Sequence, residues 1–193
     1  EANLGVSIGD LNIDINGGGA FTGTFSGISG TRTIGDFDFN DGQTLNLDLT
    51  GGGTLALPDV TAGNLRVLNI TGNTSVRIEN GDNVLFEAVT PNLNQVDTTG
   101  STGDMDLRDL DLSDNGAEIR TGSGDDRLAL CNGAAPGFEQ NDLIDAGDGN
   151  DIIFVENLPD FSGSDTVAGG DGFDQLNILE NDDPFNPGTP LRE

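Results

Sequence analysis

The sequence predicts an all-β protein in which a right-handed parallel β-solenoid begins at about residue 61 and follows a Gly/Thr-rich β region. Three observations lead to this prediction. Short runs alternate apolar and polar residues, as half-buried strands do, for example TLNLDLT from Thr44 and DIIFV from Asp151. Glycine is abundant, with 30 among 193 residues, and it favours turns. Nine-residue units recur in one frame, which indicates a stack of equivalent coils.

Residues 1–60 form the first expected unit. LNIDINGGG at 11–19 recurs as LNLDLTGGG at 45–53, an offset of 34 residues, and alternating runs lie between the two copies. We expect four to six strands with wide turns here. The pattern fits either a sandwich or the first coils of the solenoid. The recurring Leu-Asn-aliphatic triplets, at 11–13, 45–47, 68–70 and 176–178, fit either a stacked asparagine ladder or ordinary strand composition.

Residues 61–111 are expected to continue as a degenerate parallel solenoid. TGNTSVRIE begins at Thr71, and NGDNVLFEA begins nine residues later at Asn80. A period of nine residues is long enough for one turn and one short strand, so two such units complete a flattened coil.

Residues 112–180 carry the most regular repeats, and residues 181–193 read as a polar, proline-rich tail. Three strong units share Gly at their second and fourth positions, Asp at the sixth and an aliphatic residue at the eighth. They are TGSGDDRLA from Thr121, AGDGNDIIF from Ala146 and GGDGFDQLN from Gly169. A weaker unit in the same frame precedes each, which predicts three 18-residue rungs: 112–129, 137–154 and 160–177.

The charge balance points to a cationic partner. The chain has 34 acidic and seven basic residues, a net charge of −27 and no histidine, and all seven basic residues are arginines. Self-repulsion of this size opposes compaction. Nucleic acid and anionic membranes are excluded as partners, because both need a basic face. Without histidine or lysine, triads, Schiff bases and histidine-bound zinc are excluded, so we expect no enzyme. No apolar run is long enough to insert into a membrane.

The spacing of the repeats suits Ca²⁺. Glycines allow a turn to aim several carbonyl groups at one point, and the sixth-position Asp adds a carboxylate. Coils stacked about 4.8 Å apart bring equivalent turns together, so that two turns supply the six to eight oxygens that Ca²⁺ takes. The acidic residues of the strong units are expected to form two ladders on one edge: Asp125, Asp126, Asp148, Asp151, Asp171 and Asp174.

These units resemble the haemolysin-type RTX repeat, G-G-x-G-x-D-x-aliphatic-x, over about a third of the chain. The resemblance implies a Ca²⁺-loaded parallel β-roll. It implies carboxylate ligands from the sixth-position residues, namely Asp126, Asp142, Asp151, Asp165 and Asp174. It also implies mainly carbonyl ligands from Thr121, Ser123, Ala146, Asp148, Gly169 and Asp171. The first position is glycine only at Gly169, and inserts interrupt the tandem run, which are two departures from the family pattern.

Three functions remain open. The stretch from residue 65 into the repeats is similar to RTX-type surface-layer proteins and secreted adhesins. We therefore expect an extracellular or cell-surface structural protein that folds with Ca²⁺ and self-associates into a layer or filament. The alternatives are a calcium-binding module of a larger secreted enzyme, and an adhesin with a ligand site in residues 1–60. An EF-hand counted from Asp145 fits poorly, because no helices are expected to flank it.

Overall fold

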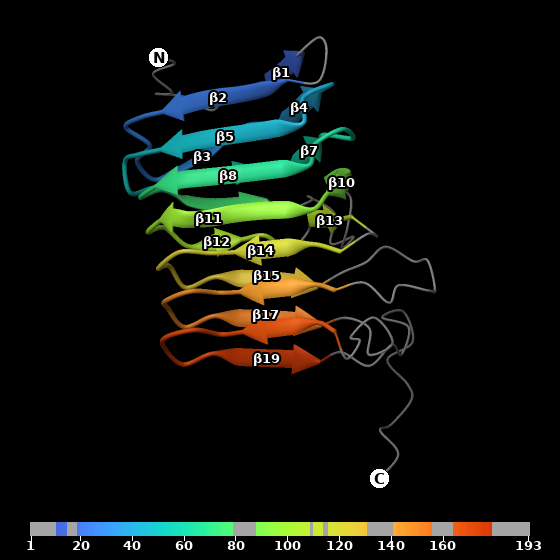
Figure 1. Ribbon diagram of the computed structural model, residues 1–193. Helices are drawn as coiled ribbons and strands as arrows, with labels where there is room; N and C mark the ends of the chain where they lie inside the picture. Colours follow the sequence, from blue (N-terminus) through green and yellow to red (C-terminus); the bar gives the residue numbers. More distant parts are fainter. Residues whose placement is uncertain are drawn as a thin grey trace, which may run out of the picture.

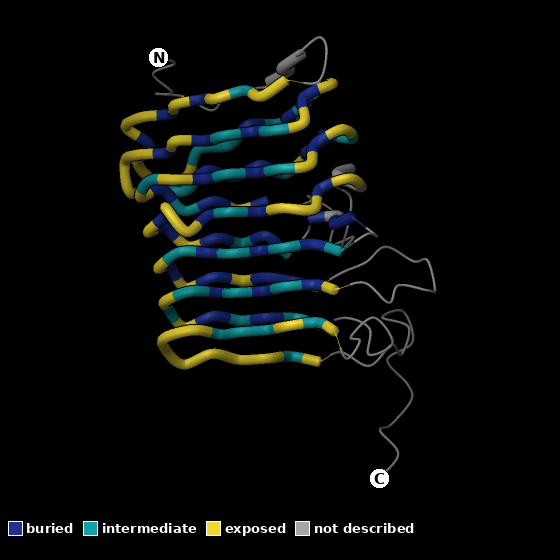
Figure 2. The backbone as a smooth tube through the Cα atoms, in the orientation of Figure 1, coloured by how far each residue is buried: buried dark blue, intermediate teal, exposed yellow. Residues whose placement is uncertain are grey.

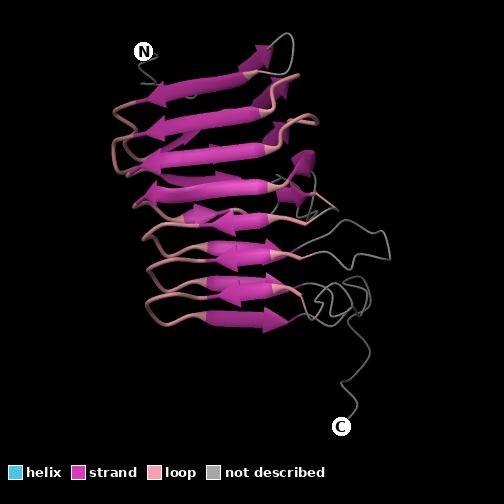
Figure 3. Ribbon diagram, in the orientation of Figure 1, coloured by secondary structure: helices cyan, strands magenta, loops and turns pink. Residues whose placement is uncertain are grey.

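The computed structural model describes residues 11–14, 19–78, 88–108, 110–113, 116–130, 141–155 and 164–178. Throughout these residues the chain consists of strands and loops, which confirms the all-β prediction (Figure 3). The strands are β1 (Leu11–Asp14), β2 (Ala20–Phe25), β3 (Thr31–Thr33), β4 (Asp36–Asn40), β5 (Thr44–Leu49), β6 (Thr54–Leu57), β7 (Asp59–Thr61), β8 (Val67–Gly72), β9 (Ser75–Ile78), β10 (Ala88–Leu93), β11 (Gln95–Ser101), β12 (Met105–Asp106), β13 (Leu110–Leu112), β14 (Glu118–Arg120), β15 (Arg127–Leu130), β16 (Leu143–Asp145), β17 (Ile152–Val155), β18 (Thr166–Ala168) and β19 (Gln175–Ile178).

The strands build a parallel β-solenoid with three sheets (Figure 1). The first sheet has the order β2-β5-β8-β11-β14-β16-β18, and the second has the order β3-β6-β9-β12-β15-β17-β19. The third sheet is shorter, with the order β1-β4-β7-β10-β13. The coil therefore has three sides up to Leu112, and within the described residues after Leu112 it has two.

The core runs along the inside of the solenoid (Figure 2). β5 alternates inward leucines with outward polar residues, so Leu45, Leu47 and Leu49 are buried while Asp48 faces solvent. Burying one such side chain contributes roughly 1.5–3 kcal/mol. The last coil is different, because Leu176 and Ile178 are each 48% exposed.

Residues 19–61 are the first coils of the same solenoid and not a sandwich. Phe21, Leu45 and Leu68 lie side by side on β2, β5 and β8, at intervals of 24 and 23 residues. The offset of 34 found in the sequence is not the coil repeat, because Leu11 pairs with Phe37 in the third sheet. The segments at 11–19 and 45–53 resemble each other only because strands in all sheets of the coil alternate apolar and polar residues in the same way.

The C-terminal rungs stack in the predicted register. The eighth-position residues Ile119, Ile144 and Val167 pair on β14, β16 and β18. Leu128, Ile153 and Leu176 pair in the same way on β15, β17 and β19. The unit that begins at Asn80 lies outside the described residues.

The asparagine ladder forms in part. Asn46 and Asn69 lie next to each other on β5 and β8, and Asn69 Nδ2 donates a hydrogen bond of 2.7 Å to Asn46 Oδ1. Asn12 lies in the third sheet and Asn177 in the second, so these two asparagines do not join the ladder. The triplet pattern therefore recurs in all three sheets, and only two of its four copies stack.

Candidate metal-binding edge

The three strong repeats place their turns on one edge of the solenoid, which we call the acidic edge. It consists of residues 121–126, 146–151 and 169–174, each of which connects a strand of the first sheet to a strand of the second (Figure 1). The two weaker repeats place Asp142 and Asp165 on the opposite edge, directly before β16 and β18. The five sixth-position aspartates are therefore divided between two edges.

Glycine is required in the acidic edge because consecutive turns are in direct backbone contact. Gly149 has a φ of 138° and Gly172 a φ of 143°, in the region that side chains rarely adopt. A Cβ atom on Gly149 would overlap the carbonyl oxygen of Gly124, and one on Gly172 would overlap the carbonyl oxygen of Gly149. The repeated glycines thus let equivalent turns stack without a gap.

The sixth-position aspartates form one column in this edge. The Oδ1 atom of each accepts a hydrogen bond from the equivalent backbone N–H of the preceding coil. Met105 N donates to Asp126 at 2.7 Å, Asp126 N to Asp151 at 2.8 Å, and Asp151 N to Asp174 at 3.1 Å. Each carboxylate is therefore held between its own turn and the one before it.

The other carboxylate oxygen is left without a partner at two of these positions. Asp126 is 1% exposed and Asp151 is 0% exposed. The Oδ2 atoms of both residues are buried and accept no hydrogen bond. A buried carboxylate oxygen in this state is costly unless a cation or a proton is bound to it.

The column occupies positions that are apolar in earlier coils. Leu55, Val76 and Met105 pair in register on β6, β9 and β12, and all three are buried. Asp126 follows Met105 in this column, since Asp106 and Arg127 pair directly beside them. The interior at this edge therefore changes from apolar to acidic along the solenoid.

The burial changes the protonation of these groups. Burial raises the pKa of Asp126 to about 7, although the adjacent Thr121 side chain and the hydrogen bond from the Met105 N–H lower it, and neighbouring carboxylates raise it. Burial also raises the pKa of Asp151 and is the largest of its causes. The backbone hydrogen bond from Asp126 lowers this pKa, and the charge of Asp174 raises it. In the absence of a cation, Asp126 thus takes up a proton close to neutral pH.

The first-position residues face this column across the turn. Thr121 and Ala146 are buried, and the Thr121 hydroxyl donates a hydrogen bond of 2.7 Å to the Ala146 carbonyl. Gly169 leaves room for the acid opposite, because a Cβ atom there would overlap Asp174 Oδ2. The Thr121 side chain is thus close to the Asp126 carboxylate, and the Gly169 backbone is close to the Asp174 carboxylate.

The third-position residues lie on the outside of the edge. Ser123, Asp148 and Asp171 are exposed, and Asp148 and Asp171 pair as an isolated parallel bridge. Among the described residues, no three Asp, Glu, Cys or His side chains converge on one point. A cation in this edge therefore needs backbone carbonyls as ligands in addition to one or two carboxylates.

A second ladder runs along the fifth position, in the opposite direction. Asp104 Oδ1 accepts a hydrogen bond from Asp125 N at 3.0 Å, and Asp125 Oδ1 accepts one from Asn150 N at 2.8 Å. Ser75 Oγ and Asn150 Oδ1 extend the ladder at its two ends, as acceptors from Asp104 N and Phe173 N. The six acids expected in two ladders therefore lie in three columns.

Sequence reasoning missed two members of this ladder, Asp104 and Asn150. Asn150 occupies a fifth position that the repeat pattern leaves unspecified. Asp104 lies in GSTGDMDLR, which begins at Gly100, and the sixth position of this unit is Met105 instead of aspartate. The Gly-Asp pair at 103–104 was the available signal.

The opposite edge repeats the backbone-capping arrangement. Asp142 Oδ1 accepts a hydrogen bond from Ala117 N at 2.7 Å, and Asp165 Oδ1 accepts one from Asp142 N at 2.9 Å. Asp142 is 5% exposed. The turns that precede these two aspartates lie outside the described residues. Of the predicted ligands at this edge, the structure therefore places only the two carboxylates.

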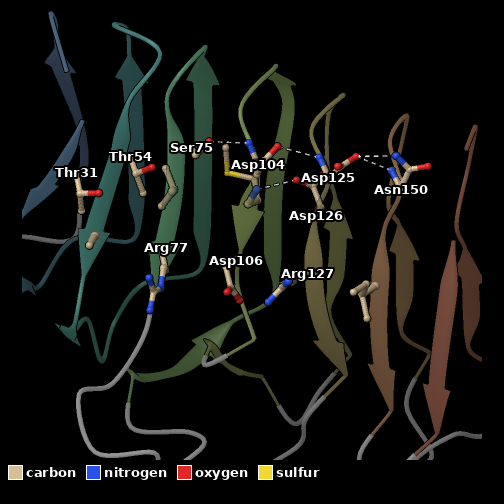
Figure 4. Close-up of a pocket in the computed structure, with 14 residues that line it drawn as sticks. Thr31, Thr54, Ser75, Arg77, Asp104, Asp106, Asp125, Asp126, Arg127 and Asn150 are labelled. Carbon is tan, nitrogen blue, oxygen red and sulfur yellow. Dashed lines mark hydrogen bonds between the residues drawn. The ribbon is translucent and has the colours of Figure 1, made fainter. Parts of the chain in front are cut away.

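A groove of about 570 Å³ runs along the outer face of the second sheet, next to the acidic edge (Figure 4). Its floor carries Arg77, Asp106 and Arg127 in register on β9, β12 and β15. Arg108 also contacts Asp106, with Nε–Oδ1 and Nη2–Oδ2 distances of 2.7 Å each. Arg108 therefore pairs with the Asp106 carboxylate, and Arg77 and Arg127 occupy the neighbouring strand positions on either side of it. Hydroxyl groups line the other half of the groove, from Thr31, Thr54 and Ser75.

The described residues include no helix that could cross a membrane. Comparison of the chain with protein-family models, with curated proteins and with solved structures finds no match.

Proposed function

We propose that the chain is an extracellular calcium-binding structural protein of the RTX type. Its acidic coils fold when Ca²⁺ binds between successive turns, and the folded solenoid assembles into a surface layer or a filament. The observation that carries the proposal is the pair of buried Oδ2 atoms of Asp126 and Asp151, which accept no hydrogen bond. Each lies on the inside of a turn lined by first-position oxygens and requires a positive partner there.

Electrostatics gives the size of the effect. Two unit charges about 5 Å apart repel by roughly 3 kcal/mol at an effective dielectric constant of 20. The column of Asp126, Asp151 and Asp174 contains two such neighbouring pairs. A cation between each pair turns this repulsion into attraction. At a Ca²⁺ concentration tenfold above the dissociation constant, each site stabilises the folded state by about 1.4 kcal/mol.

The ligand types favour Ca²⁺ over other metals. Carboxylate and carbonyl oxygens are hard ligands, and the described part of the edge offers neither a thiolate nor an imidazole. Ca²⁺ accepts six to eight oxygens in flexible geometry, whereas Mg²⁺ demands a near-ideal octahedron and retains its water. We therefore expect Mg²⁺ not to replace Ca²⁺.

Circular dichroism during a calcium titration, followed by chelation, tests the proposal. Ca²⁺ should increase the β signal, EDTA should reverse the increase, and Mg²⁺ should have little effect. Asp151→Asn should weaken the response, while Asp48→Asn, an exposed control on β5, should not. An unchanged spectrum after exhaustive EDTA dialysis, with no metal retained by elemental analysis, would refute the proposal.

The groove on the second sheet favours one alternative, a calcium-binding RTX module that binds a ligand for a larger secreted protein. The groove is lined by hydroxyl, amide and carboxylate groups, with two arginines among four aspartates, and this lining suits a linear, polyhydroxylated ligand such as a neutral oligosaccharide. Binding of acidic and neutral oligosaccharides to the calcium-loaded chain tests this function. Loss of binding in Arg127→Gln would support it, and no binding by the unaltered chain would exclude it.

A further inference from the structure

The solenoid has two open ends. β2 and β3 are the outermost strands of the first and second sheets at the N-terminal end, which we call the head, and β18 and β19 are outermost at the C-terminal end, the tail. Among the described residues, no strand pairs with the outer side of these four strands. Unpaired edge strands are ready to pair with another chain. The exposed Leu176 and Ile178 at the tail add apolar surface to that tendency.

One interior column carries opposite charges at the two ends. It begins at the head with Arg32, which pairs with the buried Leu55 on β6 and therefore faces inward. The Nε atom of Arg32 is buried and donates no hydrogen bond. The same column ends at the tail with Asp174, which is exposed. An unpaired guanidinium nitrogen and an accessible carboxylate thus occupy equivalent positions at opposite ends of the molecule.

We propose that copies of this chain stack head to tail and that Arg32 of the partner subunit pairs with Asp174. The register of both sheets fixes this match. Continuation of the first sheet by one coil places Phe21 of the partner subunit beside Val167, the end of a column of apolar residues. Continuation of the second sheet places Ile34 of the partner subunit beside Leu176, and the charged pair lies between these apolar contacts.

The contact between the tail of one subunit and the head of the next, which we call the joint, differs from the contacts between coils inside the chain. Within the acidic edge, a sixth-position carboxylate faces another carboxylate, and a cation is needed between them. At the joint, a guanidinium group supplies the positive charge and donates to the carboxylate directly. Contact between unlike surfaces leaves a free head and a free tail, so that the assembly grows as an open filament. This inference rests on the proposed function, because the tail coil carries the calcium-dependent Asp174.

Sedimentation of the 193-residue chain in saturating Ca²⁺ measures the association, and circular dichroism of the same samples measures folding. Arg32→Glu should weaken association at least about 30-fold, because it places two negative charges at the joint. Arg66→Glu makes the same change in net charge at an exposed position away from both ends and should associate normally. Equal association of Arg32→Glu and the unaltered chain would overturn the proposal.

A mixing experiment guards against a folding defect in one variant. Arg32→Glu and Asp174→Arg should each remain monomeric alone, since each presents like charges at its own joint. A mixture should form alternating filaments, because every joint in it then pairs opposite charges. Asp174→Arg removes one carboxylate of the calcium column, so its calcium-induced β signal should be reduced but retained through Asp126 and Asp151. A mixture that stays monomeric while both variants show such a signal would refute the joint. A chain that folds with Ca²⁺ but never associates would refute the stacking and would leave calcium-dependent folding intact. A chain whose circular dichroism does not respond to Ca²⁺ would refute the proposed function itself.

Discussion

Acidification should stabilise the metal-free acidic edge, whereas most proteins lose stability when carboxylates are protonated. The pKa of Asp126 is raised from an ordinary value of 3.8 to about 7 in the folded state. The folded state therefore binds this proton more tightly than the unfolded state between about pH 4 and pH 7. The resulting stability is complete below pH 4 and is lost as the pH rises through 7. Three pKa units correspond to on the order of 4 kcal/mol.

Calcium should reverse this trend. A cation on Asp126 must displace the proton, so calcium affinity should fall by up to about tenfold per pH unit below pH 7. Stability in saturating Ca²⁺ should therefore be higher at pH 8 than at pH 5. The two curves of unfolding free energy against pH, one in EDTA and one in Ca²⁺, should converge on the acidic side and separate above neutral pH.

Urea denaturation at pH 5, 6, 7 and 8, with EDTA or with Ca²⁺, measures both curves. Asp126→Asn carries no titrating group at this position, so its stability in EDTA should vary less with pH and should exceed that of the unaltered chain at pH 8. The exposed Asp48→Asn should follow the unaltered chain. A metal-free chain whose unfolding free energy rises steadily from pH 5 to pH 8 would contradict this reasoning.

Two further predictions concern packing. Gly149→Ala should lower the unfolding free energy by at least about 2 kcal/mol, because Gly149 has a positive φ and lies against a neighbouring carbonyl. Gly63→Ala, where no atom lies within 4 Å of the added Cβ, should change it by less than about 1 kcal/mol in the same urea experiment. Leu128→Ala should cost about 2–5 kcal/mol because Leu128 is fully buried, and Leu176→Ala should cost less than half as much in the monomer. Equal losses at the two leucines would contradict the packing described for the last coil.

The rungs after residue 112 could be predicted because every feature of their turns is set by single residues. Gly147 and Gly149 have positive φ values and direct backbone contacts, so glycine is required at these positions in each coil and recurs in the sequence at a fixed spacing. The equivalent turns of the earlier coils also contain glycines in close backbone contact, such as Gly53 and Gly72, but an apolar residue follows in place of the aspartate, so the nine-residue frame is not recognisable there. Their strands alternate like those of any half-buried sheet, so that a sandwich and a solenoid remained equivalent.

The orientation of the aspartates could not be predicted from spacing. The sequence indicated carboxylates near the turn, but not that Asp126 and Asp151 would occupy the column that Val76 and Met105 fill in earlier coils. Which residue enters that interior column depends on the register between neighbouring coils, and the spacing within one repeat does not determine this register. The third sheet was missed for a related reason, because short strands such as Asp59–Thr61 carry too few alternating residues to be recognised.

Within the described residues, the coils after Leu112 have two sheets instead of three, and this difference affects the expected response to calcium. Up to Leu112 the coil encloses large buried side chains such as Phe37 and Phe39, and these apolar contacts stabilise the coil without a cation. The described coils after Leu112 have two sheets, and one of their interior columns is acidic. Chelation should therefore unfold the C-terminal coils first. Hydrogen exchange in EDTA at pH 8 should be fast for amides of β16 and β17 and slow for those of β5 and β8. Uniform exchange along the chain would show that the metal-free solenoid opens as one unit and that the apolar coils gain nothing from their third side.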